Sequence, residues 1–145
     1  MIADEASPAC FGCGTHNPHG LKLHFEEMEG GVCAEVLLGP RWQSWPGRVH
    51  GGVVASVLDE ALAWAVQLAT GKRVVTTTLK IRYVAPVQVD TPYQVRARLS
   101  GGPSGLGMSN RVLRGEGEIV THGGQLIVAG DASFMALEME ANDGE

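Results

Sequence analysis

The sequence predicts an α+β domain in which one antiparallel sheet is wrapped around a single central helix. Residues 51–70 lack proline and are apolar around most of a helical circumference, so other elements are expected to enclose this helix. Segments with strand character precede and follow it, separated by glycine-rich turns. The chain has 145 residues, and a domain of ~150 residues buries roughly 70% of the surface that its unfolded chain exposes. We therefore expect a core that needs no disulfide or structural metal.

Two strands are expected before the helix. From residue 20 to residue 25, leucine and phenylalanine alternate with lysine and histidine, which is the period of a half-buried strand. Gly30 and Gly31 predict a turn, and residues 32–38 predict the second strand of a hairpin. Residues 39–50 contain proline, glycine and two tryptophans, which indicates a loop that packs against the domain.

The helix is expected to end just before Gly71. Lys72 and Arg73 follow, where positive charge favours the negative end of the helix dipole. One stripe of the helix carries no large apolar side chain, and it consists of Ser56, Asp59, Glu60, Ala63, Gln67 and Thr70.

Four strands are expected after the helix, at residues 74–84, 91–99, 108–121 and 125–137. Residues 101–107 predict a flexible turn, and residues 122–124 predict a compact hairpin connection.

Three regions of the chain are expected to differ in character. A cysteine- and glycine-containing segment covers residues 1–19, the domain covers residues 20–137, and residues 138–145 form a flexible acidic tail.

Composition narrows the class of partner. The net charge is −5 with scattered lysine and arginine, which argues against nucleic acid. The longest apolar runs, such as residues 61–66, fall far short of the ~20 residues that span a bilayer. Asp4 and Glu5, without an apolar stretch, argue against a secretory signal, and an odd number of cysteines indicates reduced thiols. We expect a cytoplasmic protein without membrane or nucleic-acid partners.

The start of the helix and its two carboxylates are the candidate reactive groups. The N–H groups of Gly51 and Gly52 lie at the positive end of the helix dipole, where they suit a developing oxyanion. Asp59 and Glu60 are the only carboxylates of the helix, and a carboxylate against an apolar helix suits a general base or a nucleophile.

The spacing of these groups limits how they can cooperate. Asp59 lies eight residues after Gly51, which corresponds to ~12 Å along one helix. One carbonyl carbon cannot lie ~3 Å from both groups of a single helix. Either the Gly51 N–H is not the oxyanion donor, or the two groups come from different subunits, and we favour a two-fold dimer.

Three segments together resemble the hotdog-fold thioesterase superfamily, nearest the branch of phenylacetyl-CoA-type and acyl-CoA thioesterases. They are His-Gly-Gly at residues 50–52, Leu-Asp-Glu-Ala at 58–61, and Val-Thr-Thr-Thr-Leu-Lys-Ile-Arg-Tyr-Val-Ala-Pro at 75–86. The resemblance covers residues 20–137. His-Gly-Gly alone is a weak signal, because it recurs at residues 122–124.

The resemblance implies catalytic roles for four residues. Asp59 matches the family's catalytic carboxylate, which activates water or attacks the thioester. Gly51, with the backbone of His50, matches an oxyanion donor that the opposite subunit supplies. Thr76 matches a serine or threonine that hydrogen-bonds the attacking water or the carboxylate.

Four further residues are candidates for substrate binding. The family often has an asparagine six residues before the histidine, where this chain has Ser44, and neighbouring Gln43 is the candidate substitute. Gly52 adjoins the oxyanion donor, and Glu60 is expected to pair with a neighbour or with a positive group of the substrate.

Simpler interpretations stay open for several of these residues. Asp59 and Glu60 also fit a solvated helix stripe. His50 fits either a general base or a side chain that bonds loop backbone. Trp42 and Trp45 fit loop packing as well as an acyl pocket. The candidates for binding phosphate groups of a CoA carrier are Arg82, Arg111 and Arg114.

The N-terminal segment contains zinc-ligand residue types in the pattern Cys10, Cys13, His16 and His19. Four ligands within ten residues strain a tetrahedral site, so the pattern favours a packed glycine-rich turn with a part-buried thiol. A catalytic cysteine is disfavoured further, because nothing indicates an activated thiolate.

The sequence therefore predicts a hydrolase that converts an acyl-CoA-type thioester to a carboxylate and a free thiol, without a metal or another cofactor. The expected assembly is a homodimer, with a homotetramer as the alternative. Two rival functions are a non-catalytic acyl-CoA binding protein and a 3-hydroxyacyl thioester dehydratase. The acyl group stays open, as does the carrier, which is either CoA or an acyl-carrier protein.

Overall fold

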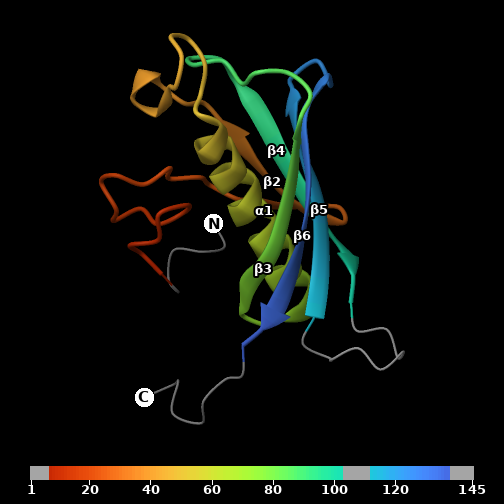
Figure 1. Cartoon of the computed structure of the whole chain (residues 1–145). Helices are drawn as coiled ribbons and strands as arrows, with labels where there is room; N and C mark the ends of the chain where they lie inside the picture. The colour runs from red at the N-terminus through yellow and green to blue at the C-terminus, as the bar shows by residue number, and fades with distance from the viewer. Residues whose placement is uncertain (1–6, 103–111, 138–145) are drawn as a thin grey trace.

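One helix lies across one antiparallel sheet in the computed structural model, which describes residues 7–102 and 112–137 (Figure 1). The sheet has six strands in the order β1-β2-β4-β5-β6-β3. The elements are β1 (Glu26–Met28), β2 (Gly31–Val36), the 3-10 turn η1 (Pro40–Trp42), α1 (Gly51–Thr70), β3 (Val74–Tyr83), β4 (Tyr93–Gly101), β5 (Val112–Thr121) and β6 (Leu126–Ala136). The predicted fold class is confirmed.

Helix α1 forms over the predicted residues because both of its ends are capped. His50 caps the start with its side chain, and Gly71 ends the helix in the left-handed conformation at φ 70°. The length and hydropathy of α1 would suit a membrane span. Here its buried residues form the centre of the core: Val54, Val57, Leu58, Ala61, Leu62, Ala65 and Val66.

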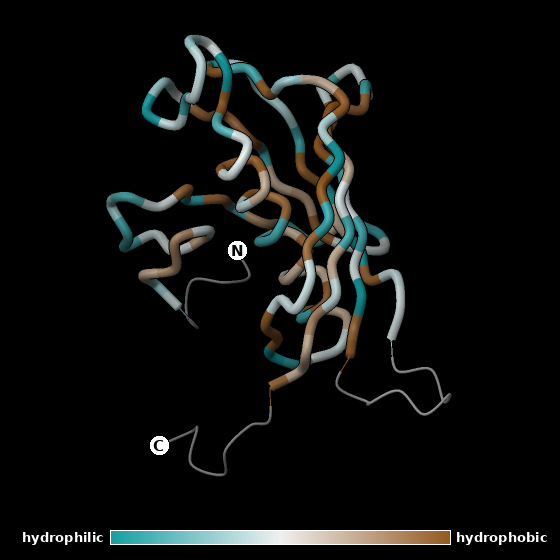
Figure 2. The backbone as a smooth tube through the Cα atoms, in the orientation of Figure 1, coloured by the Kyte–Doolittle hydropathy of each residue, from teal (hydrophilic) through white to brown (hydrophobic). Residues whose placement is uncertain are grey.

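The sheet presents one apolar face to α1. Along β4, Tyr93, Val95 and Ala97 are buried and alternate with more exposed polar residues. Figure 2 shows this alternation of hydrophobic and hydrophilic positions along the strands. Gly115 on β5 lets the helix approach the sheet closely, because a Cβ there would lie 3.2 Å from a methyl group of Val66, which is tighter than an ordinary contact.

The expected strand at residues 20–25 is wrong, and the first strand begins only at Glu26. The apolar residues of the segment are buried as the alternation predicts. However, its backbone pairs with the N-terminal segment: Leu21 donates to the Phe11 carbonyl at 2.8 Å and Leu23 donates to the Gly12 carbonyl at 2.9 Å. Alternation of apolar and polar residues indicates which face of a segment is buried. It does not indicate which other segment provides partners for the backbone hydrogen bonds.

The other predicted strands exist, with shifted ends. β2 ends at Val36, before the predicted limit, and β4 begins at Tyr93 rather than two residues earlier. Within the described residues, β5 begins at Val112. The remainder of the predicted 101–107 turn, the first residues of the predicted 108–121 strand, and the acidic tail lie outside the described residues.

The segment before residue 20 packs on α1 and contributes to the core. Its Cys13 is 2% exposed and belongs to the main apolar cluster. Figure 1 shows this segment, in red, beside the helix. The boundary predicted at residue 20 stays a prediction.

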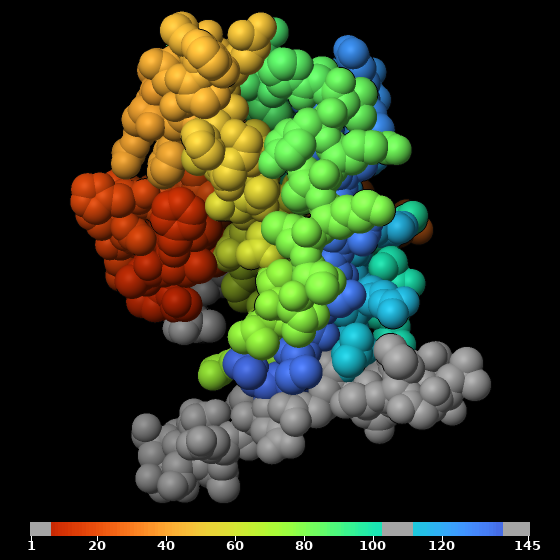
Figure 3. Space-filling model, viewed as in Figure 1, coloured from red at the N-terminus to blue at the C-terminus, as the bar shows by residue number. Residues whose placement is uncertain are grey.

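Strand β3 is an edge of the sheet and, among the residues that the structure describes, pairs only with β6. Most of its residues are exposed, including Val75 at 46%, Leu79 at 37% and Tyr83 at 48%. In Figure 3 the green side chains of β3 run uncovered along the molecule. A ten-residue edge with exposed apolar side chains is suited to pairing with another strand.

Candidate active site

Asp59 and Thr76 are directly connected. The Thr76 hydroxyl donates a hydrogen bond of 2.7 Å to Asp59 Oδ1. Asp59 lies in the middle of α1 and is half-buried, whereas Thr76 is exposed on β3. A β-bulge follows Thr76, because the pairing with β6 is interrupted before Thr78. Bulges redirect side chains, and this one accompanies the turning of Thr76 toward the helix.

The start of α1 is organised by His50. Its Nδ1 accepts the Gly52 N–H at 2.9 Å, and its carbonyl accepts from Val53 and Val54 at 3.0 and 3.1 Å. A helix begins with four N–H groups that lack partners within the helix. Three of them bond His50, so Gly51 supplies the fourth. The Gly51 N–H is therefore the one of these four N–H groups that does not bond His50.

The side chain of His50 acts here as a cap. Because Nδ1 accepts a backbone N–H, that nitrogen carries no proton while the cap is intact. The structure thus matches the simpler of the two interpretations for His50. It also shows that the Gly52 N–H is already bonded, so a substrate contact through that group would require the cap to open.

Tyr83 contacts the candidate oxyanion-donor residue, and the sequence alone did not single it out. Its hydroxyl donates to the Gly51 carbonyl at 2.6 Å, which fixes the first peptide unit of the helix from the end of β3. Although the residue as a whole is exposed, partial desolvation of its hydroxyl raises the pKa of Tyr83, so the phenol stays protonated at neutral pH. Tyr83 is the tenth residue of a strand-forming segment, so the sequence around it indicated only β propensity. Its contact with Gly51 spans 32 residues, which local patterns do not report.

Gln43 and Ser44 lie in the loop that leads into α1. The Gln43 side chain accepts the Gly47 N–H at 3.3 Å, and Ser44 donates its backbone N–H to the Arg48 carbonyl at 2.9 Å. Gly47 has φ 82°, which a glycine adopts without strain. Both side chains are exposed, and their proposed role toward substrate stays a prediction.

The two tryptophans of this loop differ. Trp42 is half-buried, packs edge-on against Phe11 at 6.2 Å between ring centroids, and has the Arg41 guanidinium 4.7 Å above its ring. Trp45 is 74% exposed. Trp42 therefore serves loop packing, and Trp45 is open to a ligand or to another chain.

Glu60 is oriented toward the N-terminal segment. Its Oε1 accepts from the Trp64 indole at 3.1 Å and from the Cys10 thiol at 3.4 Å. The expected pairing with a neighbour is present, although the neighbours are a thiol and an indole. Its candidate role in substrate binding stays a prediction.

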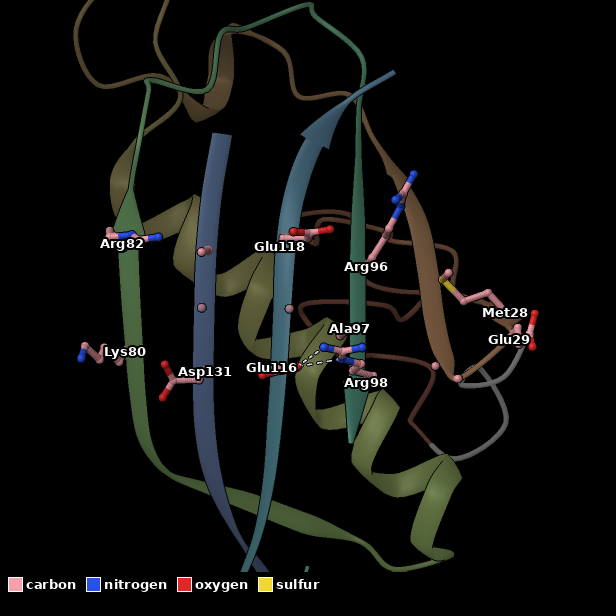
Figure 4. Close-up of a pocket in the computed structure, with 15 residues that line it drawn as sticks. Met28, Glu29, Lys80, Arg82, Arg96, Ala97, Arg98, Glu116, Glu118 and Asp131 are labelled. Atoms are coloured by element: carbon pink, nitrogen blue, oxygen red, sulfur yellow. Dashed lines mark hydrogen bonds and ion pairs between the residues drawn. The ribbon is translucent and has the colours of Figure 1, made fainter. Parts of the chain in front are cut away.

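A groove lies on a different face of the molecule. It measures about 690 Å³ and is bordered by Lys80, Arg82, Arg98, Glu116 and Asp131 among others (Figure 4). These polar residues belong to β3, β4, β5 and β6. Neither Asp59 nor Thr76 lines the groove. Arg82 faces it, Arg114 is exposed, and Arg111 lies outside the described residues.

A single chain leaves the reactive groups separated. Gly51 begins α1, whereas Asp59 lies eight residues further along it, or ~12 Å along the axis. The chain therefore brings together two pairs, Thr76 with Asp59 and Tyr83 with Gly51, at different ends of β3.

Comparison with known proteins relates this chain to the thioesterase superfamily. The family model of that superfamily matches residues 46–102, which carry α1, β3 and all of β4. No curated protein matches the sequence.

Solved structures share the fold. The thioesterase superfamily protein RHA08564 is 30% identical with a TM-score of 0.74, over 84% of this chain and 60% of that one. A hypothetical thioesterase protein with coenzyme A from Streptococcus pneumoniae TIGR4 is 15% identical with a TM-score of 0.67, over 82% and 88% of the two chains. BH2602 from Bacillus halodurans, with CoA, is 23% identical with a TM-score of 0.62, over 83% and 77%.

The predicted resemblance to the thioesterase superfamily is thus confirmed, and the chain shares the hotdog fold of these neighbours. The chain spans 60% of the length of RHA08564. Family and fold support a function of the thioester-hydrolase type.

Proposed function

We propose that this protein hydrolyses an acyl-CoA-type thioester, with Asp59 as the reactive carboxylate. The observation that carries the proposal is the 2.7 Å hydrogen bond from Thr76 to Asp59, within the segment that matches the thioesterase superfamily. This bond occupies Oδ1 and fixes the carboxylate, which leaves Oδ2 for chemistry. Two neighbours of the same fold were solved with CoA, which supports a CoA thioester as the substrate class.

The chemistry follows from these groups. Oδ2 of Asp59 either removes a proton from water as the water attacks the carbonyl carbon, or attacks that carbon itself. The carbonyl oxygen then becomes an oxyanion, which the Gly51 N–H stabilises at the positive end of α1. The carbon–sulfur bond then breaks, and the leaving thiolate takes a proton that derives from the water. If Asp59 itself has attacked, water hydrolyses the resulting mixed anhydride and restores the Asp59 carboxylate, so both routes give a carboxylate and a thiol.

The site is completed by a second copy of the chain. The exposed β3 edge supports antiparallel pairing of β3 with β3 of another copy. Thr76 and Tyr83 lie symmetrically about the midpoint between Leu79 and Lys80. A two-fold axis at that midpoint puts Thr76 of one copy opposite Tyr83 of the other. Because Thr76 bonds Asp59 and Tyr83 bonds Gly51 within each copy, this pairing brings Asp59 of one copy toward Gly51 of the second.

The proposal also includes an oligomeric state and a cellular compartment. The working unit is a homodimer, and the charged face around the groove is available for a homotetramer. The protein works in the cytoplasm, where thiols stay reduced and CoA thioesters are made.

Hydrolysis is tested with a panel of aromatic and medium-chain acyl-CoAs, with the released thiol detected. We expect turnover by the native protein and loss of turnover in Asp59→Asn, with the dimer retained in sedimentation. Asp131→Asn is the matched control, because it makes the same change on the opposite face and should leave kcat unaltered. Unchanged kcat in Asp59→Asn would falsify the assignment.

The same samples separate the rival functions. Thermal stabilisation by acyl-CoA without product over hours would instead indicate a binding protein. Hydration of an enoyl-CoA without thiol release would indicate a dehydratase.

A further inference from the structure

Cys10, Cys13 and Glu60 form a cluster that the proposed hydrolysis does not use. One ligand atom from each residue, two sulfurs and a carboxylate oxygen, lies within 4.8 Å of the other two. The cysteines come from the N-terminal segment, and the glutamate comes from the middle of α1. Cys13 is buried, whereas Cys10 and Glu60 are half-buried, so the cluster adjoins solvent on one side.

The turn between the two cysteines is folded to present both sulfurs. The Gly14 N–H donates to the Cys10 carbonyl at 3.0 Å, which closes the turn around Cys13. A Cβ at Gly12 would lie 2.4 Å from the Glu60 carboxyl carbon. Glycine at this position therefore lets the turn sit directly on the carboxylate.

The spacing suits a tetrahedral cation with soft and hard ligands. For Zn²⁺, metal–sulfur and metal–oxygen bonds of about 2.3 and 2.0 Å at tetrahedral angles separate sulfur from oxygen by about 3.5 Å. The Cys10 sulfur lies 3.4 Å from Glu60 Oε1. The observed distance between this sulfur and this oxygen is close to the distance expected around zinc, so small movements of the two side chains suffice to bind the ion.

The surroundings of the cluster also suit a cation. The groups that act on the charge of Cys13 are Glu60, Trp64 and Cys10, and none of them is basic. Burial and the Glu60 carboxylate raise the pKa of Cys13 well above its usual range. Trp64 donates its indole N–H to Glu60 Oε1 at 3.1 Å and to the Cys13 sulfur at 3.4 Å, which orients both ligands.

We propose that Cys10, Cys13 and Glu60 bind one Zn²⁺ ion, which ties the N-terminal segment to α1. Binding releases the two thiol protons to solvent, and a water fills the fourth position. The site differs from the set considered on sequence grounds, since His16 and His19 are exposed and Glu60 takes their place. Glu60 follows Asp59 directly, so the ion would brace the helix beside the reactive carboxylate.

The direct test is metal binding by the full, reduced chain after removal of metal by a chelator. We expect one zinc per chain, release of protons on binding, and a higher Tm with zinc than with chelator. Cobalt should give thiolate charge-transfer absorption that zinc abolishes. Absence of stoichiometric binding, or absence of thiolate absorption with cobalt, overturns the proposal.

Variants assign the ligands. Glu60→Gln should weaken zinc binding by ~10-fold or more, and Trp64→Phe by about 10-fold through loss of the orienting N–H. Cys33→Ser is the matched control, because Cys33 lies on β2 outside the cluster. Equal zinc affinity in Glu60→Gln and Cys33→Ser would remove Glu60 from the site and refute the proposal. All readouts are independent of hydrolysis, so this site and the proposed function fail separately.

Discussion

Asp59 and Glu60 are adjacent carboxylates with different surroundings. Adjacent residues of a helix point about 100° apart, so each meets a different part of the fold. Asp59 meets Thr76 on β3, and Glu60 meets Cys10 and Trp64. At the scale of single residues, helix geometry therefore divides the pair into a candidate catalytic carboxylate and a candidate metal ligand.

The hydrogen bond from Thr76 can be tested with an isosteric substitution. Thr76→Val removes a bond to a charged group, which is worth about 1.5–3 kcal/mol, so kcat should fall roughly 10–100-fold. Thr77→Val is the control, because that hydroxyl bonds the Ser133 carbonyl instead. Steady-state kinetics of both variants check the prediction, and equal losses would contradict it.

The contribution of Tyr83 to stability is expected to depend on pH in the alkaline range. Its pKa is raised by burial from 10.0, so the unfolded chain loses this proton before the folded chain does. The stabilisation is complete below pH 10 and is lost as the pH rises above it. Tyr83→Phe should cost at most about 1 kcal/mol of unfolding free energy at pH 8. Urea denaturation should show that the difference from native protein shrinks above pH 10, and a constant difference would count against the bond.

At the scale of elements, the start of α1 depends on the His50 cap. His50→Ala should lower the unfolding free energy by about 1 kcal/mol, whereas His50→Asn should retain most of it because asparagine also caps helices. Thermal denaturation and kinetics of the two variants check this. Equal loss of kcat in both variants would indicate that His50 transfers protons. Capping of the helix would then not be the whole role of His50.

At the scale of the whole molecule, the proposed site needs two chains. Gly51→Pro removes the candidate oxyanion N–H at the first helical position, where proline is compatible with the helix. We expect Gly51→Pro and Asp59→Asn each to be inactive. Co-expressed chains should regain about a quarter of native activity, because half of randomly assembled dimers are mixed and hold one intact site. Activity measurements on the co-expressed mixture check this, and mixed dimers purified from it should show about half of native activity. No recovery would contradict a shared site.

Much of the fold could be predicted from the sequence, because its signals are local. Helix α1 was predicted to the residue, since proline is absent, glycine follows, and the apolar pattern is continuous. The strand expected at residues 20–25 was wrong, because burial alternates there without a neighbouring strand. The pairing of backbone groups is a long-range property that periodicity does not carry.

The candidate site was predicted less completely for the same reason. Family resemblance identified Asp59 and Thr76 as candidates, and the structure joins them by a hydrogen bond. Tyr83 was missed, and so was the contact of Glu60 with Cys10, since these contacts span 32 and 50 residues. The sequence by itself determined the central helix, the order of most elements and the residue types available for chemistry, because local periodicity and caps encode them. Only the tertiary structure decided which side chains meet, because packing of the helix on the sheet sets those distances.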